Sequence, residues 1–250
     1  MGPIMRPPAL VLALFVPVLL AGAPASGAGP AVDLALVLLA DVSRSIDADE
    51  YALEKQGYAG AFADPKVLAA IRSGVRGTIA VCYVEFAGPD EVRRVVDWTV
   101  VQDAAGAASF AGRLRGAERS FYGRTSISAG IDRAARSLAE TGFSAARRLI
   151  DVSGDGTNNA GRPVTDARDA AVAAGITING LTIINDHPAA YTFAHVQPPG
   201  GLTRYYRDNV IGGPGSFVLE VRDFPSFGEA MTRKLVSEIA ERRRRGPAVD

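Results

Sequence analysis

The sequence predicts an α/β fold: a single, Rossmann-like, doubly wound and mostly parallel six-stranded sheet, with one antiparallel edge strand and helices on both faces. Apolar runs of strand length alternate with helical patterns along the chain, which is typical of parallel sheets covered by helices. The short turn Gly88-Pro89-Asp90 joins the second and third apolar runs, and so short a connection requires antiparallel neighbours.

The first half of the chain supplies three strands. Asp33–Ala40 is a continuous apolar run, as expected for a strand buried on both faces. Asp47 begins a helix, and Glu50, three residues later, completes a capping box. Further strands are predicted over Gly77–Ala87 and Glu91–Thr99. The inner face of the first helix is expected to carry four side chains: Leu53, Tyr58, Ala61 and Phe62.

The second half continues the alternation. Helices are predicted over Ala104–Arg115, Ser126–Glu140, Pro163–Ala174 and Ser226–Arg243. Strands are predicted over Arg148–Ser153, Ile176–Ile184 and Ser216–Val221. The long segment Asp186–Gly215 is rich in proline, glycine and aromatic residues. A loop of that length is uncommon unless it carries function or its own short structure.

The first 28 residues predict a secretory signal peptide. Arg6 is the only charged side chain there, and an apolar stretch runs from Ala9 to Leu20. Two runs of small residues follow, Ala23-Pro24-Ala25 and Ser26-Gly27-Ala28, and either one suits cleavage by signal peptidase. The apolar stretch, about 12 residues, is too short to span a bilayer. We therefore expect a signal peptide over 1–28, one domain over 29–245 and a C-terminal tail over 246–250. The protein is expected to be periplasmic or secreted, without stable membrane insertion after cleavage.

Charge and composition disfavour several classes of function. Acidic and basic residues number 27 each, so no net field steers the chain toward nucleic acid or anionic lipid. Cys82 is the only cysteine and lies in an apolar strand, where a buried, inert thiol is expected. The chain has one cysteine and two histidines, so a zinc site built from nitrogen and sulfur ligands is disfavoured.

Side chains that carry oxygen lie in three loops between the predicted elements. Asp41, Ser43 and Ser45 come after the first strand, Thr125 precedes a helix, and Asp155 follows the fourth strand. Loops at the carboxyl ends of strands in an open α/β sheet converge on one crevice, so these residues can meet. In an extended loop, alternate side chains such as Asp41, Ser43 and Ser45 point the same way. Carboxylate and hydroxyl oxygens suit a hard divalent cation, Mg²⁺ first, with Mn²⁺ or Ca²⁺ as alternatives.

The composition of this ligand set indicates what it binds. Because three of the five donors are neutral hydroxyls, we expect a divalent ion here to retain some attraction for a further anion and to keep positions for water. An outside carboxylate can replace one of those waters. We therefore expect the partner to be a protein or an acidic ligand that supplies a carboxylate to the metal.

The three pieces together carry a family resemblance. Asp41-x-Ser43-x-Ser45 after an apolar strand, then Gly123-Arg124-Thr125, then Asp155-Gly156, resembles the metal-ion-dependent adhesion site (MIDAS) of von Willebrand factor A (VWA) domains. The resemblance covers nearly all of the chain after the signal peptide and implies a VWA fold. The stretch Tyr205–Gly215 resembles an uncharacterised family of secreted bacterial VWA-like proteins, which brings no known ligand.

The resemblance also implies a role for each residue. Ser43 and Ser45 would bind the metal directly, and Thr125 would do so in the ligand-engaged form. Asp41 and Asp155 would act mainly through waters and through hydrogen bonds to the hydroxyls.

Plainer roles remain open for some of these residues. Thr125 could be the N-cap of the following helix, although Ser126 could take that role instead. Asp155 could be a turn residue before a glycine. Asn158 and Asn159 extend the same loop and either bond the site or shape the turn.

Three functions follow from these residues. A binding module that is not an enzyme is the favoured interpretation, because no general base is evident beside the site. A metal-dependent hydrolase is the alternative, and it would need Asp186, His187 or Glu85 as the base. An accessory subunit of a larger, ATP-driven assembly is a third, which the signal peptide argues against.

Overall fold

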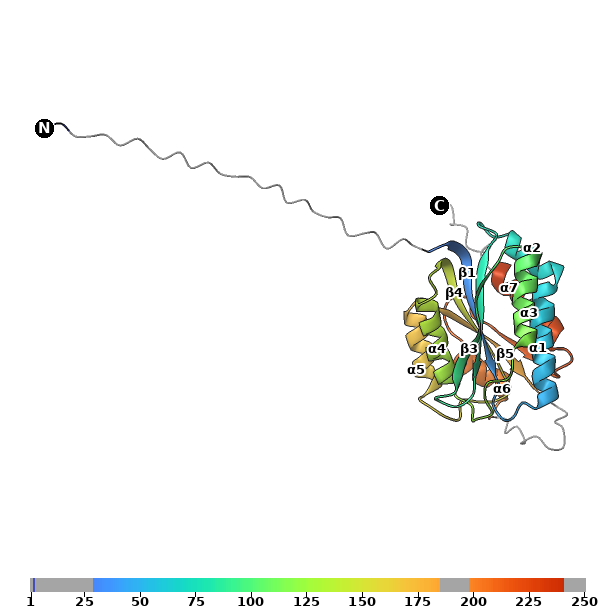
Figure 1. The fold of residues 1–250 in the computed structure, drawn as a ribbon. Coiled ribbons are helices and arrows are strands. Elements are labelled where there is room, and N and C mark those ends of the chain that lie inside the picture. Colours follow the sequence, from blue (N-terminus) through green and yellow to red (C-terminus); the bar gives the residue numbers. More distant parts are fainter. Residues whose placement is uncertain (1, 3–28, 185–197, 241–250) are drawn as a thin grey trace, which may run out of the picture.

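A computed structural model of the protein describes residue 2, residues 29–184 and residues 198–240 (Figure 1). Apart from residue 2, the predicted signal peptide 1–28 lies outside these residues. So do the tail 246–250 and the two candidate bases Asp186 and His187.

The six strands form one sheet in the order β3-β2-β1-β4-β5-β6. Every neighbouring pair is parallel except β2 and β3, which are antiparallel at one edge. This confirms the predicted fold class, including the antiparallel edge strand. The bounds are β1 Ala31–Asp41, β2 Ile79–Phe86, β3 Val92–Val101, β4 Ser144–Gly154, β5 Thr177–Ile183 and β6 Val218–Val221.

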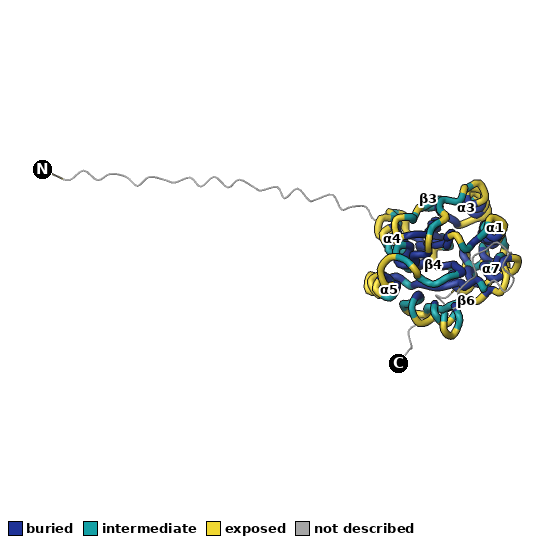
Figure 2. The backbone as a smooth tube through the Cα atoms, turned by 90° about the horizontal axis from the view of Figure 1, so that it is seen from below, coloured by how far each residue is buried: buried dark blue, intermediate teal, exposed yellow. Residues whose placement is uncertain are grey.

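Helices cover both faces of the sheet, and Figure 2 shows the buried strands between the two helical layers. Residues of β1 alternate between two cores: Leu34 and Leu36 enter the core beneath α1, while Ala35 and Val37 enter the core beneath α4. This explains why the strand is apolar throughout. One layer comprises α1 Ala48–Ala63, α2 Pro65–Arg72, α3 Ala104–Gly116 and α7 Phe227–Ala240. The other comprises α4 Ile127–Ala139, α5 Val164–Ala173 and the short α6 Leu202–Tyr205.

The inner face of α1 corrects one prediction. Tyr58, Ala61 and Phe62 are buried as expected, but Leu53 is 37% exposed. Its neighbour Glu54 is buried instead, because its carboxylate accepts a hydrogen bond from the Ser153 hydroxyl at 2.6 Å. A polar contact across the core therefore accompanies the apolar side chains on the inward side of this helix.

The described part of the long segment before β6 has its own structure. A short helix, α6, runs directly into a π-helical turn over Tyr206–Val210. A backbone bridge between Ile178 and Gly212 ties the segment to β5.

Cys82 is buried as predicted. In the described ranges, no helix combines the length and the apolar character needed to cross a bilayer.

Candidate metal centre

The sheet brings the three oxygen-bearing loops to one place. Asp41 is the last residue of β1, and Asp155 directly follows β4, the neighbour of β1 in the sheet. The loop that carries Thr125 is anchored beside them, because the Ser126 amide donates to the Ala87 carbonyl just beyond β2 at 2.7 Å. The predicted convergence at the carboxyl ends of the strands is therefore found.

The side chains of the five candidate residues form one connected cluster. The Thr125 hydroxyl donates to the Ser43 hydroxyl at 3.0 Å, and the two serine hydroxyls, Ser43 and Ser45, lie 3.1 Å apart. The Ser45 hydroxyl donates to Asp155 Oδ1 at 2.9 Å. Asp41 Oδ1 accepts the Ser43 amide at 2.8 Å. Three loops far apart in sequence thus place their oxygens within hydrogen-bonding distance of one another.

The first loop differs from the extended conformation that we expected. The Ile46 amide donates to the Ser43 carbonyl at 3.0 Å, which closes a turn around Arg44 and Ser45. That expectation was wrong, because the Asp41 carboxylate caps the Ser43 amide and bends the chain. The turn still directs both serine hydroxyls into the cluster.

Burial makes the two carboxylates costly to ionise. Asp41 is fully buried and Asp155 is 2% exposed. Burial, reinforced by the nearby charge of Asp155, raises the pKa of Asp41 to about 8. Burial likewise raises the pKa of Asp155 to about 7. A divalent cation beside them would supply the missing countercharge and favour the ionised forms.

The second oxygen of the Asp41 carboxylate differs from the first, which accepts the Ser43 amide. Asp41 Oδ2 is buried and has no partner among the described residues, and a buried polar atom in that state is costly. In the same part of the chain, no three carboxylate, imidazole or thiol groups gather as a metal-binding set. The cluster itself offers hydroxyl as well as carboxylate oxygens. The hard-oxygen donor set fits a cation of the Mg²⁺ type.

Arg119 holds the first loop, and sequence reasoning missed it. Its guanidinium donates to the carbonyls of Val42 and Ser43, each at 2.8 Å. The same group lies over the rings of Tyr122, at 4.2 Å, and Tyr51, at 5.6 Å. A lone arginine in an irregular loop carries no sequence signal for this role, because the role depends on the packing of α1 against the loop.

Glu85 also supports this region. Its Oε1 accepts the Tyr51 hydroxyl at 2.7 Å, and its Oε2 accepts the Ser120 amide at 2.8 Å. Both oxygens of the buried carboxylate are therefore engaged in holding the segment next to Arg119. This arrangement gives Glu85 a structural role.

The hydrogen bonds around Thr125 decide between the two roles that the sequence left open for it. Ser126 is the N-cap of α4, since its hydroxyl accepts the Ala129 amide. The Thr125 hydroxyl is thereby left to the cluster. Asn159 Oδ1 accepts the Thr125 amide at 3.0 Å, and Asn158 Oδ1 accepts the Ser128 amide at 3.0 Å. The two asparagines shape the backbone that presents Thr125.

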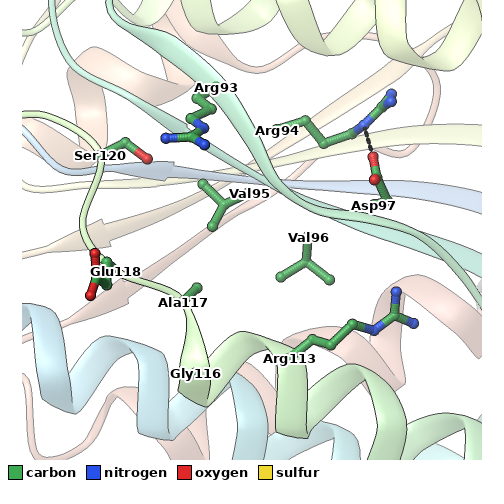
Figure 3. A pocket seen from close by; sticks show the side chains of 10 residues that line it. All are labelled: Arg93, Arg94, Val95, Val96, Asp97, Arg113, Gly116, Ala117, Glu118 and Ser120. Atoms are coloured by element: carbon green, nitrogen blue, oxygen red, sulfur yellow. Dashed lines mark hydrogen bonds and ion pairs between the residues drawn. The ribbon is translucent and has the colours of Figure 1, made fainter.

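A surface hollow of about 450 Å³ lies away from this cluster, between β3 and the end of α3 (Figure 3). Arg94 points along the strand to Asp97 and donates to it at 2.8 Å. Arg113 donates to the Thr99 hydroxyl at 2.7 Å. Because two of its three arginines already have acceptors within the chain, the hollow is a weaker candidate site than the oxygen cluster.

Comparison with known proteins places the chain in a family. The family described as "Protein of unknown function (DUF1194)" matches residues 31–243. The chain belongs to this family. The fold of this chain is VWA-like, as its similarity to solved VWA structures shows, so the VWA fold implied by the resemblance is confirmed. A search of curated protein sequences finds no match.

Three solved structures illustrate that similarity. Proximal thread matrix protein 1 from the mussel byssus, with a zinc-occupied MIDAS motif, gives a TM-score of 0.57 at 15% identity, over 85% of this chain and 47% of that chain. A von Willebrand factor type A structure from Catenulispora acidiphila gives a TM-score of 0.54 at 16% identity, over 83% of this chain and 43% of that chain. The pilus adhesin SpaC from Lactobacillus rhamnosus GG, in its open conformation, gives a TM-score of 0.57 at 13% identity, over 86% of this chain and 31% of that chain. The DUF1194 chain thus spans less than half of each solved chain, and these identities establish the fold alone.

Proposed function

We propose that this protein is an exported, metal-dependent binding module that recognises a protein or acidic ligand through a divalent cation. The observation that carries the proposal is the convergence of five oxygen-bearing side chains from three loops. One carboxylate oxygen among them, Asp41 Oδ2, is buried without a partner in the described part of the chain. A binding role of this kind needs only a cation held by this cluster, whereas a hydrolase would also need a general base.

The residues that would hold the cation are Asp41, Ser43, Ser45, Thr125 and Asp155. Mg²⁺ is the first choice because all of their donor atoms are hard oxygens, with Mn²⁺ or Ca²⁺ as alternatives. The zinc-occupied MIDAS motif of the mussel protein supports a divalent ion in this fold. When bound, the ion would have three neutral hydroxyls among its donors and would be able to accept a carboxylate from a partner.

The rim of the cluster favours a protein partner. Tyr122 is 67% exposed and stacks on Arg119, the residue that holds the Ser43 carbonyl. Arg124, also exposed, lies directly before Thr125 and donates to the Asn159 carbonyl. Exposed tyrosine and arginine side chains are typical of the central residues of protein interfaces. SpaC, which shares the fold, is a pilus adhesin.

Export is proposed from the sequence of residues 1–28. A single basic residue, an apolar stretch and small residues before a cleavage point form a signal-peptide pattern. The destination is proposed as a periplasm or the medium.

A metal-dependent hydrolase is the less favoured function. Of its three candidate bases, Glu85 has both oxygens occupied by hydrogen bonds, and Asp186 and His187 lie outside the described residues. An accessory subunit of a larger assembly shares the same binding chemistry and differs only in its partner. The binding role is therefore preferred over catalysis.

Affinity capture from the native cell envelope tests the proposal. Wild-type protein, an Asp41→Ala variant and an Asp49→Ala variant, which alters an exposed aspartate on α1, are each immobilised. Wild type and Asp49→Ala should retain the same partner in Mg²⁺ and release it in EDTA, while Asp41→Ala should retain none. A partner held equally by all three proteins, with or without Mg²⁺, would refute metal-dependent recognition.

A further inference from the structure

Tyr206 is buried against the candidate metal centre without a polar partner. It is the first residue of the π-helical turn that follows α6, and its side chain is fully buried. Its hydroxyl oxygen, Oη, has no hydrogen-bond partner among the described residues. Buried hydroxyls are usually satisfied, and π-helical turns occur frequently at functional sites. Tyr206 also packs in the core beneath α4, so these two features point to a role in addition to packing.

Two glycines make room for this side chain. A Cβ atom on Gly154 would lie 2.6 Å from Tyr206 Oη, and one on Gly180 would lie 2.9 Å from Tyr206 Cδ1. Glycine inside a strand often marks a close approach by another group. Here the end of β4 and the middle of β5 both lack a side chain where the tyrosine passes. The ring can therefore reach the end of β4, which Asp155 directly follows.

The space beside Gly154 is shared with Asp41. The same Cβ position would lie 3.2 Å from Asp41 Oδ2, the carboxylate oxygen without a hydrogen bond. An unpartnered donor and an unpartnered acceptor thus flank one backbone position. Burial, and after it the charges of Asp41 and Asp155, raise the pKa of Tyr206 well above its ordinary value. The hydroxyl consequently keeps its proton and remains a donor.

We propose that Tyr206 is a positioning residue of the metal centre, whose hydroxyl donates a hydrogen bond to Asp41 Oδ2 when a cation occupies the centre. The inference rests on the proposed metal-binding function and extends it to a residue outside the five ligands. Groups that hydrogen-bond to metal ligands fix their orientation, and loss of such a group typically weakens metal affinity 10- to 100-fold.

The test is the affinity of the full chain for Mg²⁺ alone, by calorimetry, in wild type and Tyr206→Phe. The variant keeps the ring and removes only the hydroxyl, so the dissociation constant should rise on the order of 10-fold. In EDTA its melting temperature should be unchanged or higher, because an unsatisfied buried hydroxyl is gone. A purely structural role predicts the opposite pattern: a lower melting temperature in EDTA with unchanged affinity.

Tyr83→Phe is the matched control. Tyr83 is equally buried and its hydroxyl also lacks a partner among the described residues, but its ring lies in the core on the other face of the sheet. Its removal should leave Mg²⁺ affinity unchanged. NMR provides a second measurement. The tyrosine ¹³Cζ resonance that is missing in Tyr206→Phe is assigned to Tyr206, and in wild type it should shift when Mg²⁺ is added.

Two results would overturn the inference in distinguishable ways. Equal Mg²⁺ affinity in wild type and Tyr206→Phe, with no shift of the ¹³Cζ resonance, would remove Tyr206 from the centre and leave the metal site standing. A wild-type protein that binds no divalent cation would overturn the proposed function together with this role.

Discussion

Two buried clusters of acidic side chains lie along the same strand, β4, and they are balanced differently. Deep in the fold, Lys234 of α7 donates to both Asp151 and Glu238, and Asn179 donates to Glu238 at 2.8 Å. At the end of the strand, Asp155 and Asp41 lie among hydroxyls. No ion pair to Asp41 is found in the described part of the chain.

The two clusters differ in the source of the positive charge that balances their carboxylates. Burial opposes the charge on Lys234, yet Asp151 and Glu238 outweigh it and raise the pKa of the ammonium group. The inner cluster thus carries its own cation and fastens α7 to the sheet. The outer cluster has two carboxylates with raised pKa values and no bonded cation at Asp41, which is the arrangement expected where an external ion completes the site.

The largest effect is expected in the inner cluster. Lys234→Met would leave two buried carboxylates without a countercharge, which costs about 3–5 kcal/mol of unfolding free energy. Urea denaturation should give the same loss in Mg²⁺ and in EDTA, because this cluster does not depend on metal. Arg233→Ala is the control: its ion pair with Glu229 is exposed, so the loss should be within about 0.5 kcal/mol. A Lys234→Met protein as stable as wild type would contradict the assigned role.

The second effect separates the clusters by metal dependence. At a free Mg²⁺ concentration 100 times the dissociation constant, wild type should gain about 2.7 kcal/mol of stability. Asp41→Ala should lose this gain completely, while Lys234→Met should keep it. Thermal unfolding with and without Mg²⁺ measures both. A gain of equal size in Asp41→Ala would show that the ion binds elsewhere.

The third effect concerns pH. Burial raises the pKa of Glu54 to about 8, beside Asp41 and Asp155. Folded protein therefore retains protons that unfolded chains release near pH 4, and stability falls as pH rises toward these raised values. Between pH 6 and 7 the metal-free protein should lose about 1.4 kcal/mol for each carboxyl that stays protonated when folded. Mg²⁺ should stabilise more at pH 7 than at pH 6, because it competes with those protons. Stability that rises with pH in EDTA would contradict this balance.

The smallest effect distinguishes two adjacent hydroxyls. Ser126→Ala removes the N-cap of α4 and should cost about 1 kcal/mol of stability while leaving Mg²⁺ affinity intact. Thr125→Ala should weaken Mg²⁺ binding or ligand engagement and keep the cap. Melting curves in EDTA and Mg²⁺ titrations compare the pair. The assignment fails if the two variants change the same quantity.

The fold and the outline of the centre were predictable from the sequence, and their supports were not. Apolar runs between helical patterns fix which strands are buried, and Asp41 and Asp155 stand at strand ends where loops converge. Glu54 and Lys234 were not predicted to face inward, because patterning assigns charged residues to the surface. Their burial depends on partners, Ser153 and Asp151, that are distant in sequence.

The same limit applies to Arg119 and Tyr206. Each acts through atoms of another loop or strand: a carbonyl of Ser43 for the arginine, and the bare backbone of Gly154 for the tyrosine. No periodicity or motif spacing encodes such contacts, because they arise only when the elements pack. Sequence reasoning therefore finds the oxygen donors and leaves out the groups that orient them.

The most direct measurement is calorimetric titration of Mg²⁺ into metal-stripped wild type and into Asp41→Ala at pH 7. If the outer cluster is completed by an external cation, wild type binds one ion per chain and Asp41→Ala binds none. Absence of binding in wild type, or identical binding in both proteins, would contradict the assignment of the cluster as a metal centre.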